Sequence, residues 1–193
     1  MVLKPIDPKL ARAALAAVAV GCCWRAHAQT AEVKATGYAR VPLAKRIAAD
    51  PDVVRYVAAR NASGESMDEV RRRDREWTAR QDYPLRKTLT GSPCAARLRA
   101  LIAEDSLVVE AILMDKNGGT VCASQETSDY WQGDEPKWQK PFAEKLDVFV
   151  DNPALDGSTG IYAVQLSVPV MGHKDERAGA LCLTLKIRRD LVK

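Results

Sequence analysis

The chain has 193 residues, of which 29 are Lys or Arg and 25 are Asp or Glu, giving a formal net charge of +4. Residues 1–28 hold four basic residues and one acidic residue, so the 165 residues that follow have a net charge of +1. This nearly neutral charge excludes the strongly cationic surface of a typical nucleic-acid-binding protein. A chain of this length suits one domain with a single hydrophobic core.

The first 28 residues have the three parts of a secretory signal peptide. A basic start around Lys4 leads into an uncharged run over residues 13–23. Ala26 and Ala28 then occupy the two positions that a signal peptidase reads. The uncharged run is shorter than the roughly 18 apolar residues that span a bilayer, and no second apolar stretch follows it. We predict cleavage after Ala28 and a periplasmic or secreted protein without a transmembrane segment, with a lipoprotein at Cys22 as the alternative.

After the cleavage site, residues 29–40 are expected to form a flexible segment that leads into one domain over residues 41–190. Apolar residues recur at helical spacing over residues 41–59, and this spacing predicts a helix. Pro51 lacks the N–H that a helix interior needs, so we expect the helix to stop and to restart after Asp50.

Capping residues indicate two further helices. Ser66 and Glu69 form a capping box that opens a charged helix ending near Arg80. We interpret its arginine-rich run over residues 71–75 as a solvated face. A Ser-Pro pair, an N-cap followed by proline at the first helical position, predicts the next helix over residues 93–104.

From Leu107 the pattern changes to β-rich apolar segments that are separated by turn residues. Asn117-Gly118 is typical of a hairpin turn, because these residues tolerate positive φ. Strands are expected over residues 107–114, 120–124, 146–150, 161–170 and 178–187. Since helices come first and strands follow, the predicted fold class is α+β, with N-terminal helices packed on a five-stranded antiparallel sheet.

Side chains two residues apart on a strand face the same way, which separates an apolar and a polar face of this sheet. Leu183 and Leu185 lie on the apolar face, which is expected to pack on the helices. The polar face carries Gln165, Ser167, Thr184 and Lys186. We expect the aromatic-rich excursion over residues 125–142 to cover this polar face.

Several segments in this order resemble the Cache, or PDC sensor, family. They are Leu-Met-Asp-Lys-Asn-Gly at 113–118, Val-Cys-Ala-Ser at 121–124, the Tyr-Trp-Gln-Gly-Asp region at 127–138, and the strand segments at 167–170 and 178–181. Asn61 and residues 74–77 look like the N-terminal helical region of the same family. The resemblance implies a PAS-like sheet behind a long helix, with a small-molecule pocket between the sheet and its loops.

Members of this family are commonly joined through transmembrane helices to kinase, cyclase or chemoreceptor modules. The present chain stops at Lys193, a few residues past the last expected strand. We therefore expect any output to pass through a separate partner, either a membrane-bound signalling protein or a second copy in a homodimer.

The expected ligand is a small polar metabolite of the amino acid or carboxylate type. The predicted binding residues are Tyr130, Trp131, Asp134, Trp138, Gln165, Ser167, Thr184 and Lys186. In this hypothesis Asp134 pairs with an ammonium group, and the aromatic rings add cation–π attraction. The alternatives are that the aromatic residues form a purely structural lid and that Lys186 is a solvated strand end.

Cysteine and histidine usage predicts no metal site and no cofactor. His173 is the only histidine after residue 28, and no Cys-x-x-Cys motif occurs. The three cysteines after that point are Cys94, Cys122 and Cys182. They allow one disulfide and one free thiol, and the sequence does not select the pair.

No Gly-x-Ser-x-Gly, His-Glu-x-x-His or phosphate-loop motif is present. Acidic residues that could pair for acid–base chemistry are Glu110, Asp115, Asp129, Asp134 and Glu135. We expect an exported, non-enzymatic sensor domain. An interaction protein with a vestigial pocket is the main alternative, and a small hydrolytic enzyme is the other.

Overall fold

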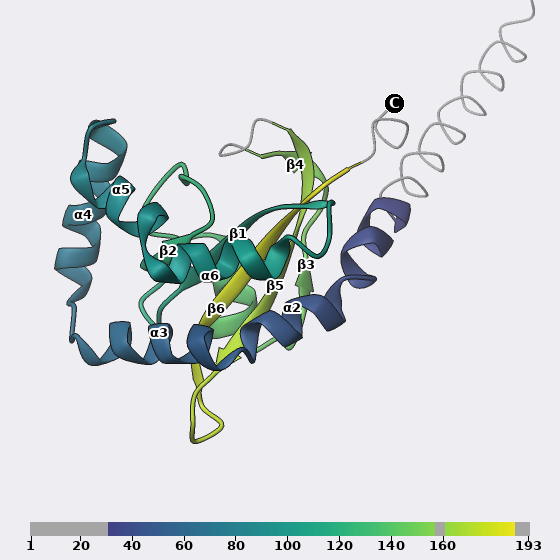
Figure 1. Ribbon diagram of the computed structural model, residues 1–193, viewed down its shortest axis with the longest axis horizontal. Coiled ribbons are helices and arrows are strands. Elements are labelled where there is room, and N and C mark those ends of the chain that lie inside the picture. The colour runs from purple at the N-terminus through teal and green to yellow at the C-terminus, as the bar shows by residue number, and fades with distance from the viewer. Residues whose placement is uncertain (1–30, 157–160, 188–193) are drawn as a thin grey trace, which may run out of the picture.

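The computed structural model describes residues 31–156 and 161–187. The predicted signal peptide, its cleavage site and Cys22 lie outside these residues. Figure 1 shows an antiparallel sheet with helices across one face and two further helices at one end. Within the described residues, no helix is both long enough and apolar enough to cross a membrane.

The helices before the sheet include α2 (Val41–Ala48), α3 (Pro51–Ala62), α4 (Met67–Ala79), α5 (Pro84–Gly91) and α6 (Pro93–Ile102). Three of them, α3, α4 and α6, begin where the sequence predicts. Asp50 caps α3 by accepting backbone N–H groups, which confirms the predicted break before Pro51. Ser66 and Ser92 cap α4 and α6 in the same way. Each cap satisfies N–H groups that the first helical turn leaves without a partner.

Two helical segments were not expected from the sequence. Residues 31–38 are helical, where we expected a flexible segment. Val33 is buried in the core, and Gly37 lies so close to Val150 that an added Cβ would approach a valine methyl to 2.8 Å. Helix α5 packs Leu85 and Leu89 against a second cluster around Trp77. In both segments, tertiary contacts fix a structure that the local pattern does not reveal.

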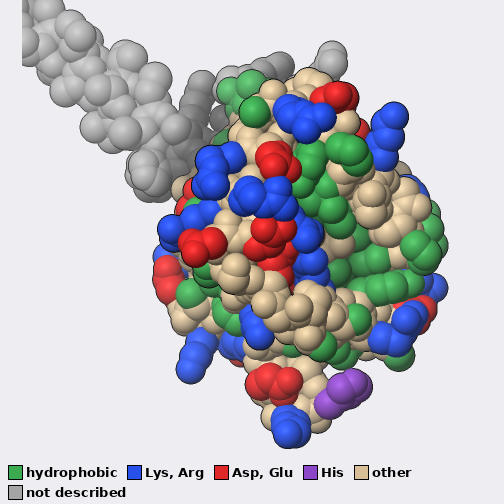
Figure 2. All heavy atoms as spheres, turned by 90° about the vertical axis from the view of Figure 1, so that its left-hand side faces the viewer, with side chains coloured by type: hydrophobic (Ala, Val, Ile, Leu, Met, Phe, Trp, Pro, Cys, Tyr) green, Lys and Arg blue, Asp and Glu red, His purple; other side chains and the backbone are tan. Residues whose placement is uncertain are grey.

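Ion pairs along α4 join half of its charged residues. Arg72 pairs with Glu69 and Glu76, both at 2.6 Å, and Arg73 pairs with Glu69 at 3.1 Å. Figure 2 shows the end of the molecule where α4 and α5 lie, with basic and acidic side chains next to one another. The solvated face predicted for residues 71–75 holds for the exposed arginines, but Asp74 is partly buried and turns toward the excursion.

The sheet has six antiparallel strands in the order β2-β1-β6-β5-β3, with β4 also on β5. Their bounds are β1 (Val108–Met114), β2 (Thr120–Ala123), β3 (Phe149–Val150), β4 (Ala154–Leu155), β5 (Tyr162–Met171) and β6 (Arg177–Lys186). The predicted α+β class, with helices packed on an antiparallel sheet, is confirmed. Two details differ from the prediction: β4 is an additional strand, and the strand expected over 146–150 is reduced to Phe149–Val150.

Arg177 explains why β3 begins late. Its guanidinium donates to the carbonyl oxygens of Lys145 and Leu146 at 2.7 and 2.9 Å and pairs with Asp147 at 2.9 Å. Lys145 itself has φ of 61°, outside the strand region. Backbone groups that a longer strand would use are therefore bound by a side chain.

The apolar face of the sheet packs on the helices as predicted. Leu181, Leu183 and Leu185 are fully buried and belong to one core cluster with Ile47 of α2 and Leu98 of α6. A Cys94–Cys122 disulfide joins α6 to β2 on this side, which settles the pairing that the sequence left open. Among the described cysteines, Cys182 is the buried free thiol.

The excursion covers the opposite face, also as predicted. Trp138 packs against a smaller apolar cluster formed by Ile112, Met114, Ala123, Ala180 and Cys182. Beyond this cluster the same face becomes polar, and the excursion lies over buried charged groups.

Candidate functional site

Backbone hydrogen bonds attach the excursion to both the helices and the β1–β2 hairpin. Asp74 of α4 accepts the N–H groups of Tyr130 and Trp131 at 3.0 and 2.9 Å. The Gln132 N–H donates to the Gly118 carbonyl at 2.8 Å. Gly118 has φ of 78°, a conformation that favours glycine. These contacts fix the start of the segment that carries the site.

A short helical turn, α7 (Pro136–Trp138), then brings a lysine toward the sheet. Trp138 donates its indole N–H to the Asp115 carbonyl at 2.9 Å and stacks on Phe142 of the π-helical turn η1 (Gln139–Ala143). Lys137 is only 6% exposed, although it carries a flexible charged side chain. Lysine is almost never this buried unless it is paired.

Acidic groups surround the buried Lys137. Its Nζ lies 3.0 Å from a Glu135 carboxylate oxygen. Burial alone would lower the pKa of Lys137, but its neighbours Cys182, Glu135 and Asp129 outweigh burial and raise it. Lys137 is therefore a stable ammonium group inside the protein.

For Asp129, burial outweighs the nearby positive charge and sets the direction of the pKa shift. Burial, followed by the charge of Glu135, raises the pKa of Asp129 to about 6, even though Lys137 acts to lower it. Gln132 donates its amide N–H to the Asp129 side chain. Burial likewise raises the pKa of Cys182 to about 12, so this thiol stays protonated at neutral pH.

Two rows of side chains on β1, β6 and β5 form the polar face of the sheet below the excursion. One row is Glu110, Thr184 and Gln165, as the strand register places them. Glu110 and Thr184 are fully buried, and the Thr184 hydroxyl donates to Glu110 Oε2 at 2.8 Å. In the next row, Ser167 lies opposite Cys182.

A polar pocket of about 180 Å³ lies between this sheet face and the loops. It is lined by Ser128, Glu135, Lys137, Asp151, Asn152, Ala154, Leu155, Asp156, Ala163 and Gln165. Gln165 donates its amide N–H to Asp156 at 3.1 Å. The lining thus combines carboxylates, one ammonium group and amides, which can pair with both charges of a zwitterion.

The structure distributes the eight predicted site residues over three places. Gln165 lines the polar pocket, while Ser167 and Thr184 are buried in the same sheet face. Lys186 is exposed at the end of β6, opposite Ala163 of the pocket lining. Trp138 covers the apolar part of this face.

The remaining predicted residues lie on the side of α4. Tyr130 is fully buried against Val70 and Trp77, and its hydroxyl bonds to Glu65 at 3.0 Å. Trp131 packs at the edge of this cluster below Arg71, and Asp134 is exposed. None of these three residues is among those that line the polar pocket.

The sequence does not predict Lys137, Asp151 or Asp156 of the pocket lining. A lysine between Pro136 and Trp138 in an aromatic segment is a weak signal, because most lysines are solvated. The sequence predicts Glu135 and Asp129 only as acidic residues that could pair for acid–base chemistry. The described residues contain no group of three or more His, Cys, Asp and Glu side chains that could hold a metal ion.

No family model matches the chain, and no curated protein matches it. The solved structures that match include sensor and ligand-binding domains of histidine kinases and chemoreceptors. The sensor domain of the V. cholerae histidine kinase DctB is 12% identical, with a TM-score of 0.46, over 88% of this chain and 56% of that chain.

Two chemoreceptor domains are similar at the same level. The ligand-binding domain of Pseudomonas fluorescens CtaA, in complex with L-alanine, is 11% identical over 83% of this chain and 56% of that chain, with a TM-score of 0.46. That of Campylobacter jejuni Tlp3, in complex with L-valine, is 16% identical over 84% and 64%, with a TM-score of 0.40.

The present chain thus spans between 56% and 64% of the length of these three chains. Sensor domains of this kind are what the resemblance to the Cache, or PDC sensor, family predicts.

Proposed function

We propose that this chain is an extracytoplasmic, non-enzymatic sensor domain that binds a small zwitterionic metabolite of the amino acid type in the polar pocket. In this proposal the domain passes its signal to a separate partner. The observation that carries the proposal is the ammonium group of Lys137, buried among carboxylates beside the pocket.

The charges of the lining determine the ligand class. Glu135, Asp151 and Asp156 are three carboxylates against the single ammonium group of Lys137. Because these carboxylates repel one another, a lining with net negative charge favours a ligand that brings a positive group. Lys137 can receive the carboxylate of the ligand, and Asp156 can receive its ammonium group.

The volume of the pocket determines the ligand size. About 180 Å³ is the space of roughly six water molecules in the liquid. This is below the roughly 300–1,000 Å³ of pockets that hold drug-sized molecules. The expected ligands are therefore small amino acids such as glycine, alanine and serine.

The disulfide supports an extracytoplasmic location. Disulfides persist in oxidising compartments such as the periplasm, and the Cys94–Cys122 bond fits that setting. Mass spectrometry of the exported protein is expected to find Gln29 as the first residue. An intact Met1 or a lipid-modified Cys22 would contradict cleavage after Ala28.

A melting-temperature screen tests the proposed ligand class. We expect small L-amino acids to raise the melting temperature, since a ligand at 100 times its Kd adds about 2.7 kcal/mol to stability. Asp156→Asn is expected to abolish the shift, whereas Lys140→Met, which removes a surface ion pair with Glu144, leaves it intact. If Asp134→Asn abolishes the shift and Asp156→Asn does not, the site lies at the aromatic cluster instead.

An interaction protein with a vestigial pocket is the second candidate. It is favoured by the pairing of Lys137 with Glu135 at 3.0 Å, which already neutralises the lysine without a ligand. In that case no member of an amino acid, amine and carboxylate panel shifts the melting temperature.

A further inference from the structure

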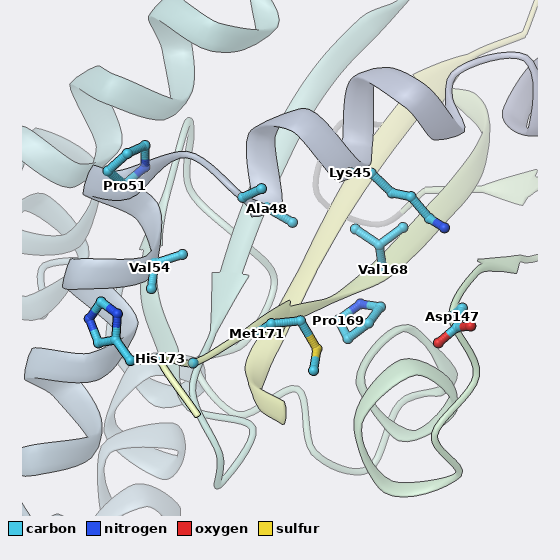
Figure 3. Close-up of a pocket in the computed structure, with 11 residues that line it drawn as sticks. Lys45, Ala48, Pro51, Val54, Asp147, Val168, Pro169, Met171 and His173 are labelled. Carbon is cyan, nitrogen blue, oxygen red and sulfur yellow. The ribbon is translucent and has the colours of Figure 1, made fainter. Parts of the chain in front are cut away.

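A second and larger hollow lies on the side of the sheet edge, between the helices and β5. Its volume is about 730 Å³, within the range of small-molecule sites. Figure 3 shows Ala48 and Val54 on the helical wall and Val168, Pro169 and Met171 on the strand wall. Its walls are thus mainly apolar, in contrast to the polar pocket.

The hollow forms where β5 runs beyond its neighbour. Phe149 and Val150 of β3 pair with Ser167 and Leu166, so in the described residues no strand pairs with residues 168–171 on that side. Pro169 lies in this stretch and has no N–H to give to an added strand. Proline at such a position is a common protection against strand addition. The hollow is therefore poorly suited to an extended peptide.

The lining of the hollow contains one Lys or Arg side chain, Lys45. Lys45 of α2 lines the hollow, and no ion pair is found for it within the described residues. The one carboxylate in the lining, Asp147, is paired with Arg177 at 2.9 Å. Lys45 is therefore the charge that remains available to a ligand.

We propose that this hollow binds a free medium-chain acyl carboxylate, with its tail along Val54, Val168 and Met171 and its carboxylate at Lys45. Burial of the tail supplies the binding free energy in proportion to its apolar area. The charge of Lys45 selects an anionic head group. This site is separate from the polar pocket, and the proposal does not depend on the proposed function.

The distribution of exposed apolar residues argues for a small ligand over a second copy. In the described part of the chain the large exposed apolar side chains are Tyr38, Leu146, Leu155, Tyr162 and Met171, and of these only Met171 lines the hollow. A stable interface typically covers about 800 Å² on each partner. The apolar surface here is concentrated inside a concave space, which suits a molecule that enters it.

Isothermal titration calorimetry with octanoate, decanoate and dodecanoate below their micelle concentrations tests the proposal. Affinity is expected to rise about fourfold for each added CH₂ group, as a buried tail requires. Decylamine, with the same tail as decanoate and the opposite charge, is expected to bind at least about fivefold more weakly. Lys45→Gln should remove this preference, whereas Lys87→Gln, on exposed α5 surface, should not.

Met171→Glu tests the position of the tail, because Met171 is exposed enough for the variant to fold. We expect at least a tenfold loss of decanoate affinity and an unchanged melting temperature. The proposal is overturned if decanoate and decylamine bind equally, or if Met171→Glu binds decanoate like the parent. It is also overturned if the protein binds anionic lipid vesicles but not free decanoate, or if light scattering finds a dimer that Met171→Glu dissociates.

Discussion

The two faces of the sheet are built from the same strands, yet their interiors differ in kind. Leu183 and Leu185 pack among apolar residues of the helices, whereas Thr184 between them faces the opposite side and bonds to buried Glu110. Buried polar groups contribute less to stability than apolar packing, because their desolvation must be offset by pairing. We infer that packing on the helix-covered face contributes most of the free energy of unfolding. The excursion-covered face contributes less, because it carries the polar groups of the candidate site.

The largest expected effect is on the helix-covered face. Leu183→Ala removes a fully buried side chain from the main core and is expected to lower the free energy of unfolding by about 3 kcal/mol. Urea denaturation measures this loss. If Leu183→Ala costs less than about 1 kcal/mol, the helix-covered face is not the stabilising one.

Loss of the Cys94–Cys122 disulfide is expected to cost about 3 kcal/mol, because the bond closes a loop across 28 residues of sequence separation. The measurement compares Cys94→Ala with the parent by denaturation under non-reducing conditions. Cys182→Ala is the matched control on the excursion-covered face and is expected to cost less than half as much. Equal losses would remove the difference between the faces.

Asp74→Ala removes the side chain that joins α4 to the excursion. Asp74 accepts two backbone N–H groups of the excursion, and losing such charged hydrogen bonds is expected to cost about 2 kcal/mol. Hydrogen exchange is expected to speed up at Tyr130 and Trp131 while the amides of β6 stay protected. Uniform loss of protection would show that the excursion is not a separate unit.

Asp129 is expected to make stability depend on pH. Its pKa is about 6 in the folded state and 3.8 in an unperturbed carboxyl group, so the folded state holds the proton more tightly. Stability therefore falls as pH rises from about 4 to 6 and is lower above that range. Because Asp129 is only half-buried, we expect the loss to be about 1 kcal/mol. Asp129→Asn should lack this loss, and parallel pH curves for parent and variant would contradict it.

The sequence predicts the regular parts of this molecule well and the site only in part. The caps at Ser66 and Ser92, the break at Pro51 and the alternation that separates Leu183 from Thr184 are local signals with a clear physical reading. Gln165 could be predicted as a site residue because strand alternation places it on the polar face of the sheet.

Lys137 depends on contacts that no local pattern encodes. Its burial depends on Trp138 packing across the sheet and on Asp74 holding the excursion, both contacts between residues far apart in the chain. For the same reason the Cys94–Cys122 pairing and the late start of β3 at Phe149 could not be read from the sequence.

Calorimetric titration of L-alanine, propionate and ethylamine into the parent and Lys137→Met tests the central claim most directly. These ligands carry both charges, only the carboxylate and only the ammonium group. We predict that the parent binds L-alanine more tightly than either analogue. Lys137→Met is expected to weaken L-alanine about thirtyfold or more and to leave ethylamine affinity nearly unchanged, because the lysine pairs only with the carboxylate. If Lys137→Met binds L-alanine as tightly as the parent, the polar pocket is not the ligand site.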